Sequence, residues 1–466
     1  MKKSIIMKTF VNKIVYCGFF FSVAFFLSAS AMAEEPWVEL FNGKDLSGWI
    51  LRNGSAVYRV ENGEIIGRTV TGSPNSFLCT AADFSDFILE FEVMKDSVLN
   101  SGVQIRSNSY PEYMNGRVHG YQVEIENRPE RRWSGGIYDE ARRGWLYDLS
   151  SNTAGGNAYR FEGWNKFRIE AYGSSIKVWV NGVPASNLVD DMTPSGFIGL
   201  QVHSIGNDPA MEGLEVHWRN IRIITHEVEK YALPMDLEVM NTDNRLTRQE
   251  QEQGWKLLFD GQTSKGWRSA YQEGFPEKGW EIRNGVLSVQ ASEGTESQNG
   301  GDIVTTDTYS DFTFELDFKL TKGANSGIKY FVTEQEANNP GSAIGLEFQL
   351  LDDENHPDAK LGNHEGSRTL ASLYDLIKAE NKLVFPVGQW NRARIVSQGN
   401  HVEHWLNGVK VLEYERKGPE YRQLVSESKY KVWPAFGEAA TGHILLQDHG
   451  NEVSFKNIKI RVGKVM

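Results

Sequence analysis

The sequence contains very little cysteine. Only two cysteines, Cys17 and Cys79, occur among 466 residues. Cys17 lies in an apolar N-terminal segment, so Cys79 stands alone in the remainder of the chain and cannot form an intramolecular disulfide there. The fold must therefore rest on a hydrophobic core, and the chain is long enough for two domains that each bury one.

The chain also lacks an excess of positive charge and, beyond its N-terminus, any long apolar run. The net charge is −12. The first 33 residues hold four lysines and no acidic residue, so their removal would change this charge to −16. Such acidity disfavours binding to nucleic acid or to anionic membranes. We therefore expect no nucleic-acid partner and, after residue 33, no stable membrane span.

The N-terminus has the pattern of a secretory signal peptide. Four lysines precede an apolar run over 14–27, which is too short and too poorly flanked for a good spanning helix. Small residues follow and end in Ala31-Met32-Ala33, an A-x-A cleavage signal. The pattern predicts a signal peptide over 1–33, cleaved after Ala33, and a periplasmic or secreted protein.

The remaining chain repeats itself once, in the same order and with similar spacing. Matching pairs of motifs are Phe41-Asn42-Gly43 with Phe259-Asp260-Gly261, Asn100-Ser101-Gly102 with Asn325-Ser326-Gly327, and Leu200-Gln201-Val202-His203 with Leu446-Gln447-Asp448-His449. A period near two hundred residues means that each unit is a whole domain. We predict a first copy over 34–226, a polar linker over 227–250 and a second copy over 251–466. Thr247 and Glu250 predict a capping box that starts a short helix in the linker.

The local pattern indicates β-structure throughout. Apolar and polar residues alternate over 88–93, 167–171, 176–180 and 314–318. Asn-Gly pairs, which favour two-residue hairpin turns, occur at 62–63, 181–182, 284–285 and 407–408. No long helical crossovers are present, so the sequence predicts an all-β fold of two tandem sandwiches.

Strand alternation places polar side chains of each copy on one face. In the first copy the candidates are Gln104, Arg106, Gln122, Glu124, Gln201 and His203; in the second they are Lys329, Glu347, Gln349, Gln447 and His449. Each copy thus offers a carboxylate, amides, a cation and a histidine from three strands, which predicts a ligand site. The alternative is an ordinary solvated face of an antiparallel sheet.

Two loops add candidate ligand-binding residues. These are Arg132, Trp133, Tyr138 and Asp139 in the first copy, and Asp352, Arg368, Tyr374 and Asp375 in the second. Aromatic rings stack on sugar C–H faces, and charged groups bind hydroxyls, so the set suits a polyhydroxylated ligand. Alternatively, the two tyrosines belong to the core. The acidic run at Asp352, Asp353 and Asp358 is a candidate loop for a divalent cation, and we expect no other cofactor.

These motifs resemble the DUF1080 family, also called the 3-keto-disaccharide hydrolase domain. In the second copy the resemblance is carried by Glu347-Phe348-Gln349-Leu350-Leu351-Asp352, His356-Pro357-Asp358-Ala359-Lys360, Leu373-Tyr374-Asp375-Leu376-Ile377 and Gln447-Asp448-His449-Gly450. The first copy is similar but lacks the His-Pro-Asp-Ala-Lys run and has Val202 in place of Asp448. The resemblance implies a concanavalin A-like jelly roll that acts on glycosides oxidised to a 3-ketone. A separate sugar 3-dehydrogenase would supply such a substrate.

The chemistry that this resemblance implies can be assigned to candidate residues. A ketone at C3 acidifies the hydrogen on C2, so a base can form an enolate and the substituent at C1 can leave by β-elimination; addition of water completes a net hydrolysis. The acid–base candidates are His203 and His449, with Glu124 and Glu347 as alternative bases. Arg106 and Lys329 could stabilise the enolate. Gln201, Gln447, Tyr138 and Tyr374 could hold hydroxyls.

The competing hypothesis is a carbohydrate-binding, lectin-like protein without catalysis. A jelly roll serves lectins as readily as enzymes, so the fold alone does not decide between them. A retaining β-glucanase on this fold would carry a Glu-x-Asp-x-x-Glu run. Glu315-Leu316-Asp317 lacks the last of these carboxylates.

Overall fold

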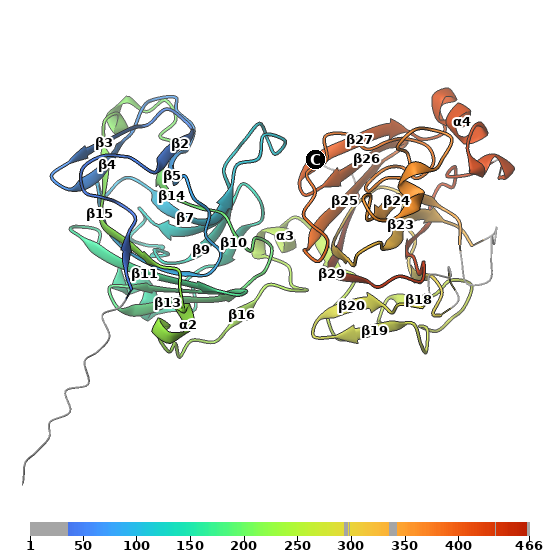
Figure 1. Cartoon of the computed structure of the whole chain (residues 1–466), viewed down its shortest axis with the longest axis horizontal. Helices are drawn as coiled ribbons and strands as arrows, with labels where there is room; N and C mark the ends of the chain where they lie inside the picture. The colour runs from blue at the N-terminus through green and yellow to red at the C-terminus, as the bar shows by residue number, and fades with distance from the viewer. Residues whose placement is uncertain (1–35, 293–296, 298, 335–342, 434, 464–466) are drawn as a thin grey trace, which may run out of the picture. The chain divides into compact units, whose positions relative to one another are not determined.

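The structure is a computed structural model that describes residues 36–463, except for 293–296, 298, 335–342 and 434. The predicted signal peptide over 1–33 lies outside the described residues. Each half of the described chain is a sandwich of two sheets whose strands pair mainly antiparallel (Figure 1). The predicted all-β fold with two tandem jelly-roll sandwiches is therefore confirmed.

The first copy contains two sheets. The polar sheet carries polar side chains on the face turned away from the core, and the backing sheet packs against its other face. Its polar sheet has the order β10-β9-β8-β7-β14-β5-β2. These strands are β2 (Trp49–Asn53), β5 (Ser76–Thr80), β7 (Ser101–Asn108), β8 (His119–Ile125), β9 (Ile137–Glu140), β10 (Gly144–Tyr147) and β14 (Phe197–Val202). Its backing sheet contains β1 (Val38–Glu39), β3 (Val57–Glu61), β4 (Glu64–Arg68), β6 (Phe87–Lys95), β11 (Asn165–Tyr172), β12 (Ser175–Val180), β13 (Val183–Val189), β15 (Glu215–Ile224) and β16 (Met240–Asn241).

The second copy has the same two kinds of sheet. Its polar sheet has the order β18-β21-β28-β23-β24. These strands are β18 (Trp267–Ser269), β21 (Ile303–Thr305), β23 (Asn325–Val332), β24 (Leu346–Leu351) and β28 (His443–Leu446). Its backing sheet contains β17 (Trp255–Leu257), β19 (Trp280–Arg283), β20 (Val286–Val289), β22 (Phe312–Leu320), β25 (Asn391–Gln398), β26 (His401–Leu406), β27 (Val409–Glu415) and β29 (Val453–Val462).

The predicted Asn-Gly turns connect neighbouring strands in both copies. They join β3 to β4, β12 to β13, β19 to β20 and β26 to β27. At each turn both residues have positive φ, for example 50° at Asn181 and 81° at Gly182. This conformation matches the twist of a two-residue hairpin and is accessible to Asn and Gly at low steric cost. The same turn at equivalent places in both copies fixes the strand register in the same way.

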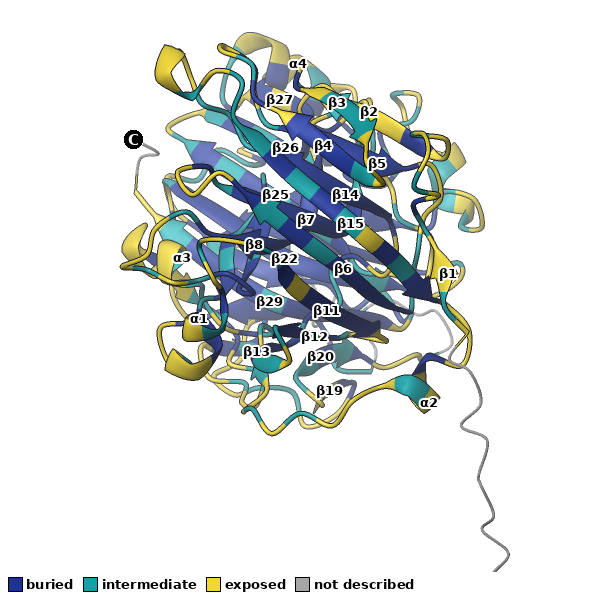
Figure 2. Ribbon diagram, turned by 90° about the vertical axis from the view of Figure 1, so that its left-hand side faces the viewer, coloured by how far each residue is buried: buried dark blue, intermediate teal, exposed yellow. Residues whose placement is uncertain are grey.

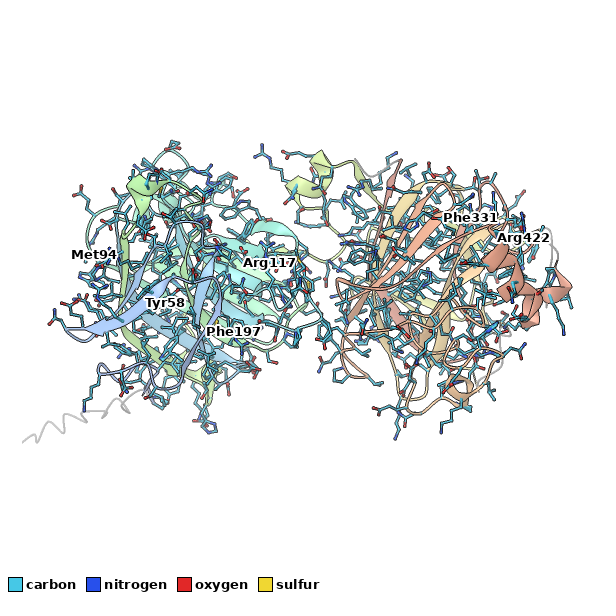
Figure 3. All side chains as sticks on the ribbon, turned by 90° about the horizontal axis from the view of Figure 1, so that it is seen from above. Tyr58, Met94, Arg117, Phe197, Phe331 and Arg422 are labelled. Atoms are coloured by element: carbon cyan, nitrogen blue, oxygen red, sulfur yellow. The ribbon has the colours of Figure 1, made fainter. Side chains whose placement is uncertain are left out.

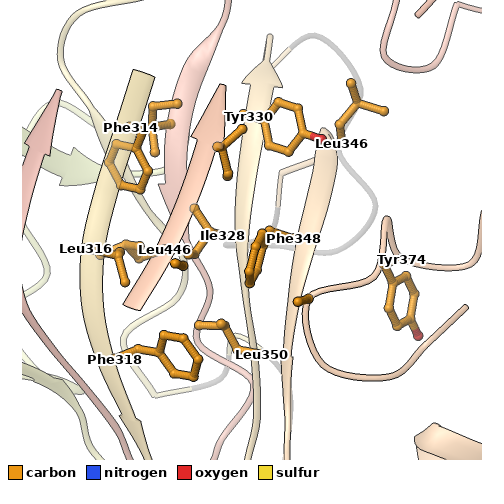
Figure 4. Close-up of a cluster of buried hydrophobic side chains, with 14 of the residues drawn as sticks. Phe314, Leu316, Phe318, Ile328, Tyr330, Leu346, Phe348, Leu350, Tyr374 and Leu446 are labelled. Carbon is orange, nitrogen blue, oxygen red and sulfur yellow. The ribbon is translucent and has the colours of Figure 1, made fainter. Parts of the chain in front are cut away.

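Apolar side chains fill the space between the two sheets of each sandwich. In the second copy Phe314, Leu316 and Phe318 of β22 pack against Ile328 and Phe348 of the polar sheet (Figure 4). Buried residues are concentrated on the strands, whereas exposed residues lie mainly on loops and helices (Figure 2). Burial of one such side chain stabilises the fold by about 1.5–3 kcal/mol. The core thus occupies one face of each polar sheet and leaves the other face for polar residues.

Helices are short and lie between the strands. They are α1 (Thr153–Ala158), α2 (Val228–Tyr231), α3 (Arg248–Glu252) and α4 (Pro419–Ser426), with single 3-10 turns at η1 (Pro209–Met211), η2 (Pro357–Lys360) and η3 (Lys429–Val432). The predicted capping box is confirmed, because the side chains of Thr247 and Glu250 each accept a backbone N–H of the other residue at the start of α3. In the predicted linker, β16 also pairs in parallel with β13.

Candidate active site

In the second copy, strand register brings a cation and a carboxylate onto the same face of the polar sheet. Lys329 on β23 lies directly opposite Glu347 on β24, and Gln349 follows two residues later on the same face. All three side chains are buried, whereas Ile328 and Phe348 between them face the core. The structure therefore brings together three of the residues that alternation predicted.

A chain of side-chain contacts connects Glu347 to His449. When its amide nitrogen faces Glu347, Gln349 donates to Oε1 of Glu347 at 3.0 Å and to the backbone oxygen of Ser326 at 3.2 Å. The side-chain amides of Gln349 and Asn325 lie 3.2 Å apart. Nδ2 of Asn325 lies 3.4 Å from Nε2 of His449. The carboxylate and the imidazole thus stand at the two ends of one polar chain.

The cation on this face has a buried acidic neighbour. Nζ of Lys329 lies 3.4 Å from Oδ2 of Asp302 and donates to the backbone oxygen of Ala343 at 3.1 Å. Oδ1 of Asp302 accepts the backbone N–H of Asp448 at 3.0 Å. Gln447 lies beside Asp302, because the register of β21 and β28 continues to this pair. Sequence reasoning did not single out Asp302, which directly precedes β21 and has no acidic counterpart in the first copy.

A second imidazole lies near His449. The ring centroids of His449 and His356 are 6.3 Å apart, and both side chains are half-buried. Nδ1 of His356 accepts the backbone N–H of Asp358 at 3.2 Å, which fixes the ring at the start of η2. Both imidazoles are thus partly accessible beside the polar face, and imidazole can take up or release a proton near neutral pH.

In each copy a glycine of one polar-sheet strand, β7 or β23, makes room for a side chain of the next strand, β8 or β24. A Cβ built on Gly327 would overlap the carboxylate of Glu347 and lie 2.8 Å from its Cδ. A Cβ on Gly102 would lie 2.6 Å from Cδ of Gln122, the equivalent residue. Side chains 122 and 347 therefore lie across these glycines, and any larger residue would displace them.

The loop after β24 holds its charged residues in an internal network. Arg368 donates to Asp375 at 2.7 Å and to Asp358 at 2.9 Å. The hydroxyl of Tyr374 donates to Asp358 at 2.8 Å, and burial raises its pKa. The backbone N–H of Lys429 also donates to the buried carboxylate of Asp375. Arg368 and Asp375, which were predicted to face a ligand, bind each other in this network. Tyr374 lies beside β24, where its backbone N–H donates to the oxygen of Glu347 (Figure 4).

The acidic run of the second copy is not arranged as a cation site. Asp352 accepts the backbone N–H of Gly323 at 2.7 Å and the amide of Asn355 at 2.8 Å. Asp353 accepts the backbone N–H of Leu370 and the ammonium of Lys382, both at 2.7 Å. Asp358 is bound as described above. Asp352, Asp353 and Asp358 thus bind loop groups rather than converging on one point, which corrects the prediction of a cation loop.

Among the described residues, one group of imidazole and carboxylate atoms is close enough to hold a metal. It consists of His401, Glu403 and Glu413 on the backing sheet, with ligand atoms within 4.8 Å of one another. The ammonium of Lys410 donates to Glu413 at 2.7 Å and to Glu403 at 3.3 Å. An amino-acid cation therefore already neutralises these carboxylates, away from the polar sheet.

The polar face of the first copy is built mainly from amides. Gln104 lies opposite Gln122 in register and donates to its Oε1 at 2.7 Å. Gln122 in turn donates to Oε2 of Glu124 at 3.1 Å, and Asn100 donates to the other oxygen of that carboxylate. The glutamine–glutamate pair of the second copy thus recurs with its two positions exchanged. Burial of Glu124 raises the pKa of its carboxyl to about 7, although the two amide donors oppose this shift.

Gln201 and His203 occupy the positions predicted for them. Gln201 is fully buried, and neither its amide oxygen nor its amide nitrogen has a hydrogen-bond partner among the described residues. His203 is half-buried, and its Nδ1 lies 2.8 Å from the backbone oxygen of Ser204. The structure therefore gives the first copy a carboxyl, amides and a histidine, but not the cation that alternation predicted.

Arg106 points away from the polar face, so the prediction that it lies beside Gln104 is wrong. The strand contains a bulge between Ile105 and Asn108, and Arg106 has a φ of 46°. The bulge breaks the alternation of side chains. Arg106 instead donates to the backbone oxygens of Ser85 and Gly173 and to Asp86. Phe331 (labelled in Figure 3), with a φ of 55°, occupies the equivalent bulge in the second copy.

Aromatic residues lie on the polar face next to this amide chain. Tyr138 is directly opposite Gln122, and Trp145 is directly opposite Tyr138, so the three share one face. The Tyr138 and Trp145 ring centroids are 5.3 Å apart, and those of Trp145 and Trp133 are 4.8 Å apart. The guanidinium of Arg131 lies 4.5 Å from the centre of the Trp133 ring. These rings are half-buried and form an accessible rim.

Two residues predicted in this loop are placed elsewhere. Asp139 faces the opposite side from Tyr138, as its neighbouring position in the strand requires, and forms ion pairs with Arg142 at 2.6 Å and Arg143 at 2.5 Å. Arg132 is exposed and has a φ of 54°, whereas Arg131 contacts the tryptophans. The repeated Asn100 and Asn325, noted only as a motif, are the site residues that the duplication could have revealed.

No helix of the described residues is long and apolar enough to cross a membrane. The two sandwiches define a tandem jelly-roll protein with carboxyl, amide and imidazole side chains on its polar sheets. Residues 36–224 and 254–461 both match the model of the 3-keto-alpha-glucoside-1,2-lyase-like domain. The chain belongs to this family and contains two tandem copies of its domain, which confirms the resemblance inferred from the motifs.

Individual relatives support the same assignment. The 3-keto-disaccharide hydrolase of Bacteroides thetaiotaomicron is 38% identical over 229 residues, which cover 45% of this chain and 78% of the relative. Two crystal structures from Parabacteroides distasonis ATCC 8503, both provisionally named glycosyl hydrolases, are 32% and 29% identical. They cover 48% and 45% of this chain and 100% and 99% of their own, with TM-scores of 0.42 and 0.35. The chain thus shares its family with the 3-keto-disaccharide hydrolase of Bacteroides thetaiotaomicron.

Proposed function

We propose that the second copy cleaves 3-keto-glycosides by removing the proton at C2 and eliminating the substituent at C1. The observation that carries this proposal is the register that sets Lys329 opposite Glu347, with His449 at the end of the amide chain. The family name, a 1,2-lyase, describes an elimination across C1 and C2. The relative's name, a hydrolase, describes the result after water has been added.

Glu347 is the proposed base. An ionised carboxylate can accept a proton but has none to donate. The amide N–H of Gln349 donates to one oxygen of Glu347 and thereby orients it. Removal of the C2 hydrogen leaves its electron pair in the C2–C3 bond and places negative charge on the C3 oxygen. The Lys329 ammonium, across the strand pair, stabilises that charge in a buried setting where water cannot compete.

His449 is the proposed acid. The electron pair then forms the C1–C2 double bond while the C1–oxygen bond breaks, and the departing oxygen takes a proton from the imidazole. Water can add to C1 of the resulting 2-hydroxy-enone, with return of a proton to C2, to give the free 3-keto sugar. Gln447 is proposed to bind a ring hydroxyl. The exchange of a proton at C2 distinguishes this route from a direct displacement at C1.

The experiment is an NMR time course of the purified protein with a 3-keto-glucoside in D₂O. Release of the aglycone with deuterium at C2 supports the proposal. Glu347→Gln should lower turnover by about 10²–10⁴-fold, the usual contribution of a positioned general base. The matched variant Glu124→Gln changes the carboxyl of the other copy, and equal losses in both variants would contradict the assignment to the second copy. Line broadening of intact substrate would favour the lectin-like alternative.

Two further proposals concern where and with what the protein works. We propose that the protein is exported to the periplasm or beyond, because its first 33 residues have the pattern of a cleaved signal peptide. We also propose that a separate sugar 3-dehydrogenase forms its oxidised substrate. Mass spectrometry of the protein from the outer cell fractions would test the first proposal by locating Glu34 at the mature N-terminus.

A further inference from the structure

The polar sheet of the first copy lacks both charges of the Lys329–Asp302 pair. Gln104 takes the place of Lys329, as the equal positions in the repeat show. In the first copy Gln201 of β14 lies opposite Phe77 of β5. In the second copy the register of β28 and β21 continues to Gln447 and Asp302, so Phe77 takes the place of Asp302. Thr80 and Thr305, which accept the backbone N–H groups of Ile198 and Ile444 at 3.0 Å, confirm this alignment. Among the described residues, no lysine or arginine takes the place of Lys329 on this face, so an enolate would lack that cation.

What remains on this face is a floor of amides. Gln104, Gln122 and Asn100 form a continuous chain of donors and acceptors that ends on Glu124. Each primary amide offers a donor and an acceptor, as a sugar hydroxyl does. The carboxyl at the end of the chain has a pKa of about 7, so about half of it is uncharged at pH 7 and most of it below that pH. The floor therefore suits an uncharged ligand rich in hydroxyl groups.

Gln201 is the strongest indication of a ligand. It is fully buried on the polar face, and both atoms of its amide lack a partner among the residues that the structure describes. Buried polar side chains are nearly always hydrogen-bonded, so an exception needs an explanation such as a bound group. Register places Gly102 between Gln201 and Glu124, and Gln122 lies across Gly102. A ligand that reaches Gln201 therefore also meets Gln122.

The rim of the same face supplies stacking surfaces. Tyr138 and Trp145 lie in the row that contains Gln104 and Gln122, and Trp133 packs against Trp145. All three rings are half-buried. Aromatic rings of this kind cover the C–H faces of pyranose rings while neighbouring polar groups bind the hydroxyls. Amide floor and aromatic rim thus complement one sugar ring.

We propose that the first copy is a non-catalytic binding site for an unoxidised sugar ring, and that it selects a hydroxyl at C3 over a ketone. A hydroxyl both donates and accepts, so it can satisfy the oxygen and the nitrogen of an amide such as that of Gln201. A ketone only accepts, and would leave the amide oxygen buried without a donor. This binding preference extends the proposed function, because that function assigns the oxidised form to the second copy.

Isothermal titration of the full mature chain with methyl α- and β-glucosides, and with their 3-keto forms under conditions without turnover, tests this proposal. Gln201→Leu should weaken binding of the unoxidised glucosides about tenfold or more, because their hydroxyl loses both partners. Gln447→Leu, the matched change in the second copy, should leave that binding within about twofold of the wild type. Trp145→Ala provides a second variant on the rim, with circular dichroism as the check on folding.

Three outcomes would overturn the proposal. They are no binding of either unoxidised glucoside by the wild-type protein at millimolar concentration, equal effects of the two glutamine variants, or tighter binding of the 3-keto form to the first copy. Failure of the proposed function would be seen separately, as absence of cleavage of the 3-keto substrate. The binding measurement does not depend on that cleavage.

Discussion

Nζ of Lys329 lies 3.4 Å from Oδ2 of Asp302, and both side chains are buried on the polar sheet of the second copy. A buried ion pair gains little net stability over apolar residues, since both charges have lost their hydration. Its presence on the face that carries Glu347 therefore points to a role in binding or catalysis. The first copy, with Gln104 and Phe77 at these places, retains the fold without it.

Replacing Lys329 with Met should abolish most of the proposed activity. Loss of the ammonium removes the stabilisation of the enolate, so turnover should fall by about 10²–10³-fold, as when an oxyanion donor is removed. It also leaves Asp302 without this cation, which should lower the free energy of unfolding by about 3 kcal/mol. Turnover of a 3-keto-glucoside and urea unfolding measure the two effects.

The double variant Asp302→Asn, Lys329→Met separates catalysis from stability. It removes the isolated charge, so we expect stability to recover substantially while turnover stays low. Recovery of turnover in the double variant would show that Lys329 acts only through folding. The experiment then has a decisive result in either direction.

Gly327→Ala should reduce turnover more than stability. A Cβ at this position would overlap the Glu347 carboxylate, which must swing away from its position over the strand. The displaced group is the end of a flexible side chain, so the cost in unfolding free energy should be within the range of about 0.5–3 kcal/mol for ordinary substitutions. A misplaced base should lower kcat by about 10²-fold. Steady-state kinetics and urea unfolding measure the two effects.

Gly102→Ala provides the matched control in the first copy, where the overlap is with Gln122. It should lower the affinity for unoxidised glucosides without the comparable loss of kcat. Equal loss of kcat in both variants would argue against a division of roles between the copies.

The sequence predicted the architecture well because its signals are local. Asn181-Gly182 and its equivalents set hairpins, and alternation assigned Glu347 and Gln349 to one face correctly. It failed at Arg106, where a bulge with positive φ reverses the direction of the side chain. Nothing in a short apolar–polar pattern indicates a bulge.

The sequence also could not predict which side chains bind one another. Arg368 and Asp375 have the residue types of a sugar site, yet they bind each other. The prediction for Lys329 could not include Asp302, which lies on a different strand and becomes a neighbour only through the sheet order. The amide of Gln201, which has no hydrogen-bond partner among the residues that the structure describes, is likewise visible only in three dimensions.

Glu124 should make the first copy less stable as pH rises. Burial raises the pKa of its carboxyl from 4.5 to about 7 in the folded state. The folded chain then binds more protons between these values, so the stabilisation present below pH 4.5 is lost as pH rises through 7. The change is about 3 kcal/mol in the free energy of unfolding.

Glu124→Gln should flatten this dependence. The variant loses the titrating group, so its stability relative to wild type should increase between pH 5 and pH 8. The variant also changes stability at every pH, because the new amide lies beside the two amide donors of Asn100 and Gln122. The test is therefore the pH dependence of the difference and not its absolute size. A relative stability that is constant over this range would show that Glu124 titrates normally.

His404 should produce the opposite dependence in the second copy. It is fully buried; its Nδ1 lies 2.9 Å from the backbone oxygen of Ala371, and its Nε2 lies 2.8 Å from the hydroxyl of Tyr330. Burial lowers the pKa of the imidazole from 6.5 to about 4, although the bond to Ala371 opposes the shift. The neutral ring donates from Nδ1 and accepts at Nε2, which links β26 to the loop that carries Tyr374.

A group whose pKa is lowered on folding stabilises the protein above its unfolded pKa. The contribution of His404, about 3 kcal/mol, should therefore be present above pH 6.5 and be lost as pH falls through 4. His404→Gln keeps a donor and an acceptor but does not titrate, so its stability relative to wild type should rise as pH falls from 7 to 4. Urea unfolding at each pH measures this difference. Glu124 changes the free energy of unfolding in the opposite direction over an overlapping pH range, so the two effects offset each other in the wild-type protein. The measurement is therefore made in the Glu124→Gln background, where of these two groups only His404 contributes. A flat difference in that background would mean that protonation of His404 does not weaken the second copy.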